Sequence, residues 1–295
     1  MRIFLTGGTG FVGTRIRDAL LTDGHEVTTL TRRERPHVAG ITWIPGTLDD
    51  TDSLEEGMRG CAAVVHLVGI IRERRGATFQ SVHVDGTRNV LAAMKAAGIS
   101  RLLHMSALGA GPKAETAYFK TKWAAEESVR ASGVAFTIFR PSIVFGPGDG
   151  FITLLARQVR VLPILPIIGT GAYLMAPVSI HVVTAAFTAA LRMNGAAVHK
   201  TFDLCGPQIL TYEEIVNLLI EHLKRPRRKV HLPVWLMRLV TGTAKVAHLP
   251  LPITRDQLAM LLKGNVCEEH HAQEVFDLPV ISLREGIGEY LHPQA

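Results

Sequence analysis

Apolar runs and amphipathic stretches alternate along the first half of the chain. Runs such as AAVVHLVGI and RLLHMSALG are continuous enough for strands buried on both faces, and apolar residues three and four apart mark the stretches between such runs as helices. This alternation predicts an α/β fold with a parallel, doubly wound sheet. Strands are expected at 2–6, 26–31, 41–44, 62–67, 101–105 and 135–139, and helices at 12–23, 51–58, 78–97 and 116–132.

The first strand runs directly into a glycine-rich turn. Residues 1–13 read MRIFLTGGTGFVG, in which the G-x-G-x-x-G spacing starts at Gly8 and glycines three apart start at Gly7. Glycine in such a turn permits the tight bend, lets the backbone approach a pyrophosphate and lets the next helix pack on the sheet. The turn predicts a dinucleotide site, with a glycine turn that binds nothing as the alternative. The residues expected at the cofactor are Gly7, Gly10, Phe11, Val12 and Gly13.

The rhythm of the chain changes after residue 146, where Pro and Gly become frequent. We expect a Rossmann-type dinucleotide-binding domain over residues 1–148 and a smaller C-terminal substrate lobe over residues 149–295. Residues 176–204 are expected to return a helix and a strand to the main sheet.

A stretch without Asp, Glu, Lys or Arg lies between Arg160 and Arg192. It is long enough to span a bilayer, but Pro163 and Pro166, together with glycines, would break a helix exposed to lipid. We expect the apolar floor of a substrate pocket at 161–178, together with a buried strand and helix. Peripheral contact with a membrane is the alternative.

The charge balance argues against nucleic acid as a partner. The formal net charge is +6 and the isoelectric point is near 9.4, yet the basic residues are scattered along the chain. Only four Tyr and three Trp accompany them, whereas a nucleic-acid groove combines clustered basic and aromatic residues. The run KRPRRK at 224–229 is interpreted as a solvated connection, with contact to a phosphate or an anionic membrane as the alternative.

Three cysteines, Cys61, Cys205 and Cys267, lie far apart and match no metal-binding spacing. Their odd number and wide separation favour a reducing compartment. The segment CEEHH at 267–271 contains metal-binding residue types, but neighbouring residues on a helix point apart, so we expect a surface turn and no metal. No basic and apolar leader precedes the first strand, which indicates a cytoplasmic protein.

The end of the second strand bears on which cofactor binds. An NAD site usually has an acidic residue there for the ribose 2′-hydroxyl, but this chain has Thr31, Arg32 and Arg33. A guanidinium binds a 2′-phosphate through two parallel hydrogen bonds, and Arg32 can also stack on the adenine. The pattern favours NADP, with NAD as the alternative. A pair of solvated loop arginines would explain the same residues without a ligand.

A candidate catalytic set consists of Ser106, Tyr118 and Lys122. Tyr118 and Lys122 are four residues apart at the start of a predicted helix, so both lie on one helix face, and Ser106 follows the strand at 101–105. We expect the Lys122 ammonium to lower the pKa of the Tyr118 phenol. Ser106 would then polarise a carbonyl while Tyr118 transfers a proton and the cofactor a hydride. The alternative is a surface tyrosine and lysine on an amphipathic helix.

Several motifs follow one another in an order typical of one family. They are TGGTGFVG, HVDGTRNVLAA and FRPSIVFGPGD, together with the catalytic set. The chain resembles the extended and atypical short-chain dehydrogenase/reductases, also called NAD(P)-dependent epimerase/dehydratases. MSALGA, PVSIHVVTAAF, LPVWLMRLV and PLPITRDQLAMLLKGNV resemble the branch that includes the accessory subunit of respiratory complex I. The resemblance implies a cofactor lined by Thr47, Leu48, Leu67, Val68, Gly69, His83, Lys122, Pro141 and Ile143.

Two positions depart from the pattern of that family. The family commonly has Asp in the motif where this chain has Gly46, Thr47 and Leu48, so we expect an adenine contact to be absent. It commonly has Asn where this chain has His83, which changes the expected support of the active-site lysine. Cofactor binding can be structural in the branch with the complex I subunit, so the resemblance alone leaves turnover open.

Three functions agree with the sequence. The favoured one is an oxidoreductase that uses NADP(H) to reduce an apolar carbonyl or quinone-like small molecule. The second is a nucleotide-sugar epimerase or dehydratase, although the lobe after residue 146 offers few clear basic groups for a diphosphate. The third is a noncatalytic NADP-binding assembly or sensor protein in contact with a respiratory complex.

Overall fold

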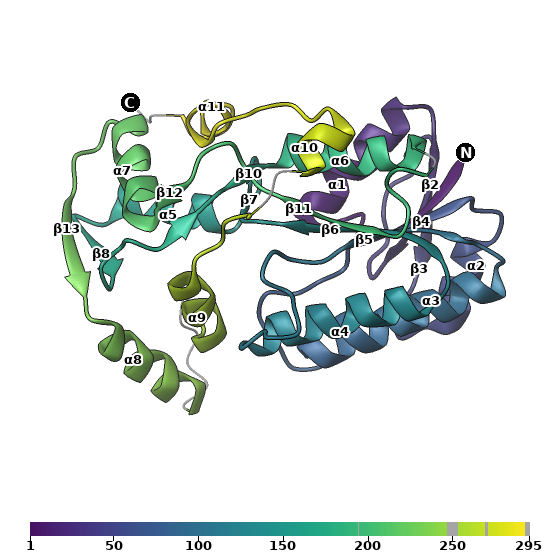
Figure 1. Ribbon diagram of the computed structural model, residues 1–295, viewed down its shortest axis with the longest axis horizontal. Coiled ribbons are helices and arrows are strands. Elements are labelled where there is room, and N and C mark those ends of the chain that lie inside the picture. The colour runs from purple at the N-terminus through teal and green to yellow at the C-terminus, as the bar shows by residue number, and fades with distance from the viewer. Residues whose placement is uncertain (194, 247–252, 269–270, 293–295) are drawn as a thin grey trace. The chain divides into compact units, whose positions relative to one another are not determined.

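Apolar runs of the first half and one run from the second half pair into a seven-stranded parallel sheet in the computed structural model (Figure 1). The strands are β1 (Arg2–Thr6), β2 (Glu26–Thr31), β3 (Ile41–Pro45), β4 (Ala63–His66), β5 (Arg101–Met105), β6 (Ala135–Pro141) and β11 (Lys200–Leu204). Their order is β11-β6-β5-β4-β1-β2-β3, so the chain starts inside the sheet and winds outward in both directions. The predicted Rossmann-type, doubly wound parallel sheet is confirmed.

The chain divides into two units, and the structure describes residues 1–193, 195–246, 253–268 and 271–292. The first unit contains the sheet and comprises Met1–Pro141, His181–Leu204 and Glu269–Pro279. The second unit comprises Ser142–Ile180, Cys205–Glu268 and Val280–Ala295. The chain therefore leaves the first unit after β6 and returns to it twice.

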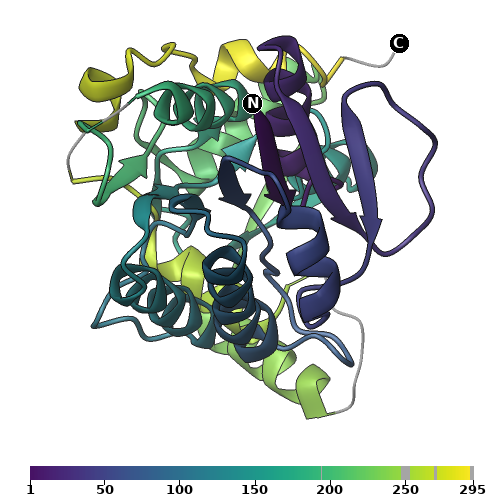
Figure 2. The same cartoon turned by 90° about the vertical axis from the view of Figure 1, so that its right-hand side faces the viewer.

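Helices cover both faces of the sheet (Figures 1 and 2). One face carries α2 (Thr51–Met58), α3 (Gly86–Ala96) and α4 (Ala117–Ala131), and the other carries α1 (Phe11–Thr22), α6 (Ile180–Arg192) and α10 (His271–Phe276). Side chains of the central strands such as Phe4, Val64 and Leu102 are fully buried between these layers. Burial on both faces is what the continuous apolar runs predict.

One predicted helix of the first unit differs in kind. The helix expected at 78–97 begins as a π-helical segment, η1 (Gln80–Asp85), which continues into α3. Apolar residues three and four apart do not separate an α turn from the wider π turn, so the pattern could not show this. The other predicted helices and strands of the first half end within two residues of the observed ends.

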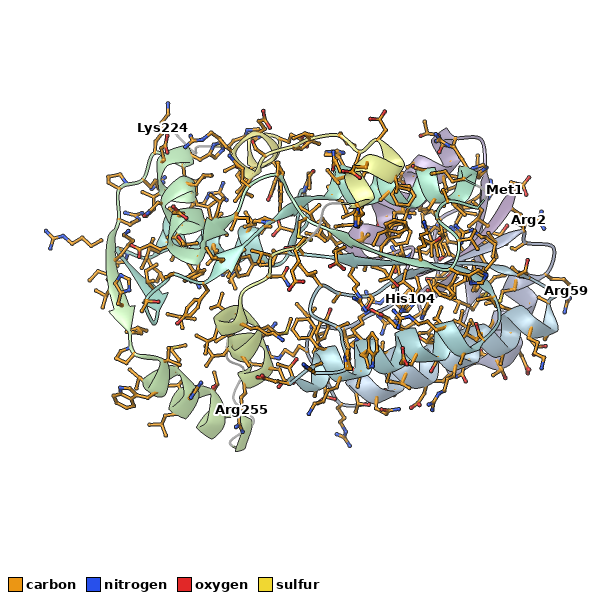
Figure 3. The ribbon with its side chains drawn as sticks, in the orientation of Figure 1. Met1, Arg2, Arg59, His104, Lys224 and Arg255 are labelled. Atoms are coloured by element: carbon orange, nitrogen blue, oxygen red, sulfur yellow. A yellow bond between two sulfur atoms is a disulfide. The ribbon has the colours of Figure 1, made fainter. Side chains whose placement is uncertain are left out.

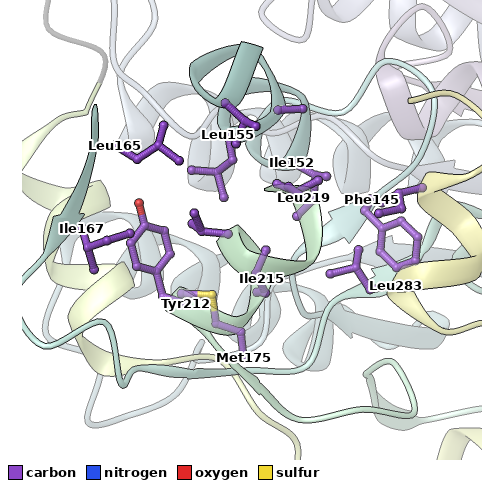
Figure 4. Packing of buried hydrophobic residues seen from close by; sticks show 14 of the residues in the cluster. Phe145, Ile152, Leu155, Leu165, Ile167, Met175, Tyr212, Ile215, Leu219 and Leu283 are labelled. Atoms are coloured by element: carbon purple, nitrogen blue, oxygen red, sulfur yellow. The ribbon is translucent and has the colours of Figure 1, made fainter. Parts of the chain in front are cut away.

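Short two-stranded sheets and helices form the second unit. The sheets pair β10 (Val178–Ser179) with β7 (Val144–Phe145), β12 (Leu210–Thr211) with β9 (Leu174–Met175), and β13 (Arg228–Leu232) with β8 (Ile164–Ile168). The helices are α5 (Phe151–Val161), α7 (Tyr212–His222), α8 (Val234–Val246), α9 (Arg255–Lys263) and α11 (Leu283–Ile287). Their apolar side chains, among them Ile152, Ile215 and Leu283, pack into a core separate from that of the sheet (Figure 4).

The charge-free stretch supplies core residues of the second unit. Leu165, Ile167 and Met175 are at most 2% exposed and pack against Tyr212 and its neighbours (Figure 4). The expectation of an apolar pocket floor is therefore wrong for these side chains, because a side chain enclosed in a core cannot line a substrate pocket. None of the described helices is long and apolar enough to cross a membrane.

Cys205 and Cys267 form a disulfide within the second unit. The backbone around Ala176 brings them together, since the Ala176 N–H donates to Asn265 O (2.9 Å) and the Gly206 N–H donates to Ala176 O (3.1 Å). The number and spacing of the cysteines therefore do not support a reducing compartment, because two of the three form a disulfide. Sequence spacing cannot show that two segments flank a third.

The segment at 267–271 is described only in part. Cys267 forms the disulfide with Cys205. Glu269 and His270 lie outside the described residues, so the expected surface turn there stays a prediction. Cys61, in the first unit, is a free and buried cysteine.

We expect reduction of the disulfide to destabilise the protein. The bond joins residues 62 apart in sequence, and a loop of that length corresponds to about 4 kcal/mol in the chain-entropy model. Urea unfolding of the wild type with and without a phosphine reductant measures the change. The control carries Cys205→Ser and Cys267→Ser, and its unfolding midpoint should be low and insensitive to the reductant. A wild-type midpoint that does not move on reduction contradicts the expectation.

Candidate active site

The predicted site residues gather at one edge of the sheet of the first unit. Parallel strands end at the same edge, and residues predicted for the site stand at or directly after the ends of five strands. They are Gly7 after β1, Arg32 after β2, Leu67 after β4, Ser106 after β5 and Pro141 at the end of β6.

The glycine turn after β1 depends on glycine at three positions. Gly7 has φ +78°, a left-handed conformation that favours glycine. A Cβ atom on Gly13 would lie 2.0 Å from Gly7 O, so α1 can pack on the turn only without a side chain there. A Cβ atom on Gly8 would lie 2.7 Å from Thr29 Oγ1. The spacing that starts at Gly7 and the spacing that starts at Gly8 therefore each include positions where a side chain would clash or strain the backbone.

The helix that follows the turn begins without a capping side chain. Its N-cap is Gly10, and its first turn carries no acidic residue. The first N–H groups of α1 are therefore free of side-chain caps, and the helix dipole adds positive potential at this end. Phe11 is half-buried here and Val12 is buried. This end of the helix can receive an anion such as a pyrophosphate.

The segment after β4 connects the glycine turn to Lys122. A Cβ atom on Gly7 would lie 3.3 Å from Val68 N and 3.4 Å from the carbonyl carbon of Leu67. A Cβ atom on Gly69 would lie 2.9 Å from Lys122 Nζ. The segment after β4 therefore lies against the glycine turn at Leu67 and Val68 and against Lys122 at Gly69.

Lys122 is buried although it carries an ammonium group, and only 2% of it is exposed. It lies in α4, whose N-cap Thr116 accepts a hydrogen bond from the Phe119 N–H. Lys122 Nζ donates to Met105 O at the end of β5 (3.0 Å). Burial lowers the pKa of Lys122 to about 8, and the charge of Glu126 opposes this shift. The ammonium form therefore predominates at pH 7.

Ser106 and Tyr118 are buried polar residues of the first unit. Ser106 is 2% exposed, and its Oγ has no hydrogen-bond partner among the described residues. Burial raises the pKa of Tyr118 to about 12. The expectation that Lys122 lowers this pKa is wrong for the structure, because desolvation dominates and the ammonium donates to Met105 O. The phenol stays protonated at neutral pH.

Arg32 and Arg33 follow β2 and are exposed. Thr31 Oγ1 donates to Arg33 O (2.6 Å) and accepts from the Arg33 N–H (3.2 Å), which fixes the bend of the chain. Neither guanidinium has a side-chain partner within the part of the chain that the structure describes. Both remain available to a ligand at this edge.

Sequence reasoning missed Arg17, which lies beside the glycine turn. Its Cζ is 5.8 Å from the centre of the Trp43 ring, and Nη1 is 3.4 Å from Gly8 O. The available signal was its position one turn beyond Gly13 on the predicted helix, where a side chain can reach back to the turn.

Thr47, Leu48 and Ile143 occupy different surroundings. Thr47 is exposed. Leu48 is half-buried and packs against α3, since a Cβ atom on Gly86 would lie 2.6 Å from Leu48 Cδ1. Asn89 Nδ2 donates to Leu48 O (2.9 Å) and fixes the loop after β3. Ile143 belongs to the second unit.

Three buried imidazoles lie behind the strand edge, and two of them were not predicted. His66 and His104, on neighbouring strands, are each 1% exposed with ring centres 5.2 Å apart. Figure 3 shows His104 between the sheet and α4. Burial lowers the pKa of His66 and of His83 to about 3, and that of His104 well below its usual value. A histidine inside each of two apolar runs was the available signal.

A surface hollow of about 460 Å³ lies elsewhere in the first unit. Its lining includes Lys95, Ile99, Ser132 and Val134, which precede β5 and β6. It therefore opens at the amino edge of the sheet, opposite to the predicted site residues. This hollow has no convergent catalytic groups, so it is not the candidate active site.

Comparison with known proteins shows similarity to NAD(P)H-binding proteins. A family model described as NAD(P)H-binding matches residues 7–153. The chain is 30% identical over 257 residues to a 2-alkyl-3-oxoalkanoate reductase of Stenotrophomonas maltophilia, with 77% of each chain covered. It is 28% identical over 264 residues to the mitochondrial NADH dehydrogenase (ubiquinone) 1 alpha subcomplex subunit 9 of Arabidopsis thaliana, covering 85% of this chain and 66% of that protein. The chain spans between about half and two thirds of the first curated relatives that it matches.

Solved structures share the architecture. The structure of MoeE5 in complex with UDP-glucuronic acid and NAD superimposes with a TM-score of 0.77 at 20% identity, covering 98% of this chain and 97% of that chain. At this level of identity the likeness establishes the fold alone.

We expect Lys122→Met to stabilise the protein at pH 7. The pKa of Lys122 falls from 10.5 to about 8 on folding, which corresponds to about 3 kcal/mol of lost stability. Loss of the hydrogen bond to Met105 O offsets about 1 kcal/mol, leaving a gain of about 2 kcal/mol. The cost is fully present below pH 8 and disappears as the pH rises toward 10.5, so the gain should shrink over that interval.

Urea unfolding at pH 7 and pH 10 measures this difference. Lys120→Met, which changes an exposed lysine of the same helix, is the matched control and should leave the unfolding free energy nearly unchanged. A Lys122→Met protein that is less stable than the wild type at pH 7 would show that the buried ammonium stabilises the fold.

Proposed function

Because the chain belongs to the extended and atypical short-chain dehydrogenase/reductases, a family of NAD(P)H-binding proteins, we propose that it uses NADPH to reduce an apolar carbonyl or quinone-like small molecule. The observation that carries the proposal is the buried set of Ser106, Tyr118 and Lys122 in the unit that bears the glycine turn. Ser106 Oγ is buried without a hydrogen-bond partner among the described residues.

The chain's residues fit a dinucleotide cofactor. Gly7 and Gly13 leave the turn open to close approach, and the uncapped start of α1 would hold the pyrophosphate. Lys122 would hold the ribose of the nicotinamide half, since Gly69 leaves its Nζ uncovered by a side chain at that point. The bound cofactor would supply the hydride.

NADP is favoured over NAD by the arginines near the adenine end of the site. Arg32 and Arg33 are exposed after β2 and free of side-chain partners among the described residues. Arg17 also lies beside the glycine turn, but its Nε and Nη2 donate to Asp18 Oδ1 (2.8 and 2.6 Å), so the preference rests on Arg32 and Arg33. A 2′-phosphate is the ligand group that suits guanidinium donors.

Ser106, Tyr118 and Lys122 have different roles in the proposed reduction. Tyr118 holds its proton at neutral pH and donates it to the oxygen of the carbonyl as negative charge develops there. Ser106 Oγ–H donates a second hydrogen bond to the same oxygen, which satisfies its buried hydroxyl. The Lys122 ammonium, bonded to Met105 O, adds a positive charge beside the residue that precedes Ser106. The set therefore stabilises the negative charge that develops on the oxygen as a ketone or aldehyde becomes an alcohol, and the phenolate left on Tyr118 takes up a proton afterwards.

An apolar substrate is favoured by one relative and by the surroundings of Ser106. The name of the Stenotrophomonas enzyme describes a keto acid that carries alkyl chains. Ala107 and Leu108 directly follow Ser106, and Leu67 is the first residue after the neighbouring strand β4. A nucleotide-sugar substrate has weaker support, because the likeness to MoeE5 extends to the fold alone.

A second candidate is a noncatalytic NADP-binding subunit. It is favoured by the similarity to the Arabidopsis subunit, which covers 85% of this chain. A phenol whose pKa is about 12 is also far from the value that is best for proton transfer at neutral pH. Turnover separates this candidate from the enzyme.

We expect NADPH to raise the melting temperature more than NADH at equal concentration, since the tighter ligand stabilises the native state more. Arg32→Asp should remove this preference, because a carboxylate repels the 2′-phosphate and accepts from a 2′-hydroxyl. Arg35→Asp, an exposed change in the same loop, is the control and should keep it. Equal melting shifts for the two cofactors with the wild type contradict the assignment of NADP.

We expect Tyr118→Phe to lower carbonyl reduction by at least about a hundredfold while NADPH affinity stays within a few-fold, since the hydroxyl acts mainly in the transition state. Single-turnover oxidation of bound NADPH against quinones, enones and aldehydes measures this. Tyr212→Phe is the control, because Tyr212 is another buried tyrosine whose pKa burial raises to about 12. Wild-type and Tyr118→Phe proteins that bind NADPH tightly but are equally inert would favour the noncatalytic candidate.

A further inference from the structure

Two buried histidines make hydrogen bonds on both sides of their rings. His66 ends β4 and His83 lies in η1, and each is 1% exposed. Burial keeps both imidazoles neutral at pH 7, with a pKa of about 3. A neutral imidazole has one N–H donor and one bare nitrogen acceptor, so the partners decide which nitrogen carries the proton.

The bonds of His83 assign its proton to Nδ1. The Ile70 N–H donates to His83 Nε2 (3.1 Å), so Nε2 is the bare acceptor. Nδ1 then carries the proton and donates to Thr121 Oγ1 (2.9 Å). The Thr121 hydroxyl donates in turn to the carbonyl oxygens of Ala117 and Tyr118, both at 3.0 Å. His83 thus joins the loop after β4 to the first turn of α4.

The bonds of His66 assign the opposite tautomer. Thr87 Oγ1 donates its proton to His83 O (2.6 Å), so His66 Nε2, 3.0 Å from that oxygen, must be the donor. His66 Nδ1 is then the acceptor for the Thr6 hydroxyl, 2.6 Å away. Thr6 Oγ1 also accepts from the Leu67 N–H (3.1 Å). His66 therefore joins the end of β1 to Thr87 at the start of α3, whose hydroxyl reaches η1.

The ring of His83 also contacts Tyr118 directly. It stacks on Phe79 with ring centres 5.5 Å apart, and it meets the Tyr118 ring edge-on at 5.4 Å and 84°. The ring is therefore fixed by two hydrogen bonds and two aromatic contacts. A displaced His83 would shift both the backbone and the ring of Tyr118.

We propose that His66 and His83, held in opposite neutral tautomers, form one linkage from the glycine turn to the first turn of α4, in which His83 is a positioning residue for Tyr118. The linkage runs from Thr6, next to Gly7, through His66, Thr87 and the His83 backbone and ring to Thr121. It fixes the position of the glycine turn relative to the first turn of α4. Its kinetic consequence rests on the proposed reductase function, whereas the tautomers do not.

The tautomers are measured by long-range ¹H–¹⁵N spectra of the ¹⁵N-labelled full chain at pH 7. The His83 signals, identified by their loss in His83→Phe, should show a protonated Nδ1, and the His66 signals, lost in His66→Phe, a protonated Nε2. If either variant fails to fold, selective labelling and contacts to Thr121 and Thr6 identify the signals in the wild type. The same tautomer at both positions, or a charged ring at either, overturns the linkage.

The positioning role is measured by hydride-transfer rate against NADPH affinity. His83→Phe keeps an aromatic ring on Phe79 but loses both hydrogen bonds, so the rate should fall roughly ten- to a hundredfold while the NADPH Kd stays within about threefold. His83→Asn places an amide donor near the position of Nδ1 and should recover most of the rate. His104→Leu is the matched control, because His104 is equally buried but neither ring nitrogen has a partner among the described residues.

The outcomes separate this inference from the proposed function. If His83→Phe is no slower than His104→Leu, or if His83→Asn is no faster than His83→Phe, the positioning role is overturned. If the wild type reduces none of the carbonyls, the proposed function fails, and amide exchange decides the linkage instead. His83→Phe should then speed exchange in the first turn of α4 while His104→Leu leaves it unchanged, and equal exchange in the two variants overturns the linkage.

Discussion

A buried ammonium group bonded to the end of a strand is the constraint on which the candidate site depends. Lys122 Nζ donates to Met105 O, and the approach of Gly69 leaves no room for a side chain beside it. The histidines behind it are neutral, chiefly because they are buried and further because they face this charge. The positive group at this position therefore adds to the effect of burial in keeping these imidazoles neutral, and their partners then decide the hydrogen-bond directions.

Local pattern accounts for most of what could be predicted of the first unit. The glycine turn needed only the spacing of Gly7, Gly8 and Gly13, because each glycine has a steric reason within a few residues of β1 or its neighbour β2. The strands could be predicted because burial on both faces leaves continuous apolar runs. Tyr118 and Lys122 share a helix face, as a spacing of four residues requires.

The errors arose where the outcome depends on packing between distant segments. Leu165 was interpreted as a pocket residue, because an apolar side chain looks the same in sequence whether it lines a pocket or fills a core. The Cys205–Cys267 disulfide depends on Ala176 lying between two segments, which no spacing reveals. The pKa of Tyr118 depends on how completely the ring is buried, and the helix spacing to Lys122 carries no information about that.

His83 shows how little a departure from a family pattern says about what the new side chain does. Read as a missing Asn, it implied altered support for the lysine. In the structure Lys122 is held by Met105 O, and His83 instead bonds to Ile70 and Thr121. The π turn of η1 carries this imidazole, and no periodicity in the sequence distinguishes that turn from an α-helix. The side chain therefore has a definable task that its residue type alone did not suggest.

The most direct test of the central claim is transfer of deuterium from NADPH labelled at the transferring position of the nicotinamide. The labelled cofactor is incubated with the wild-type protein and a panel of alkyl ketones, enones and quinones, and the products are analysed by mass spectrometry. The account predicts an alcohol or reduced product that carries deuterium with at least one apolar carbonyl, and none with Tyr118→Phe. Tight binding of NADPH with no labelled product from any member of the panel would contradict it.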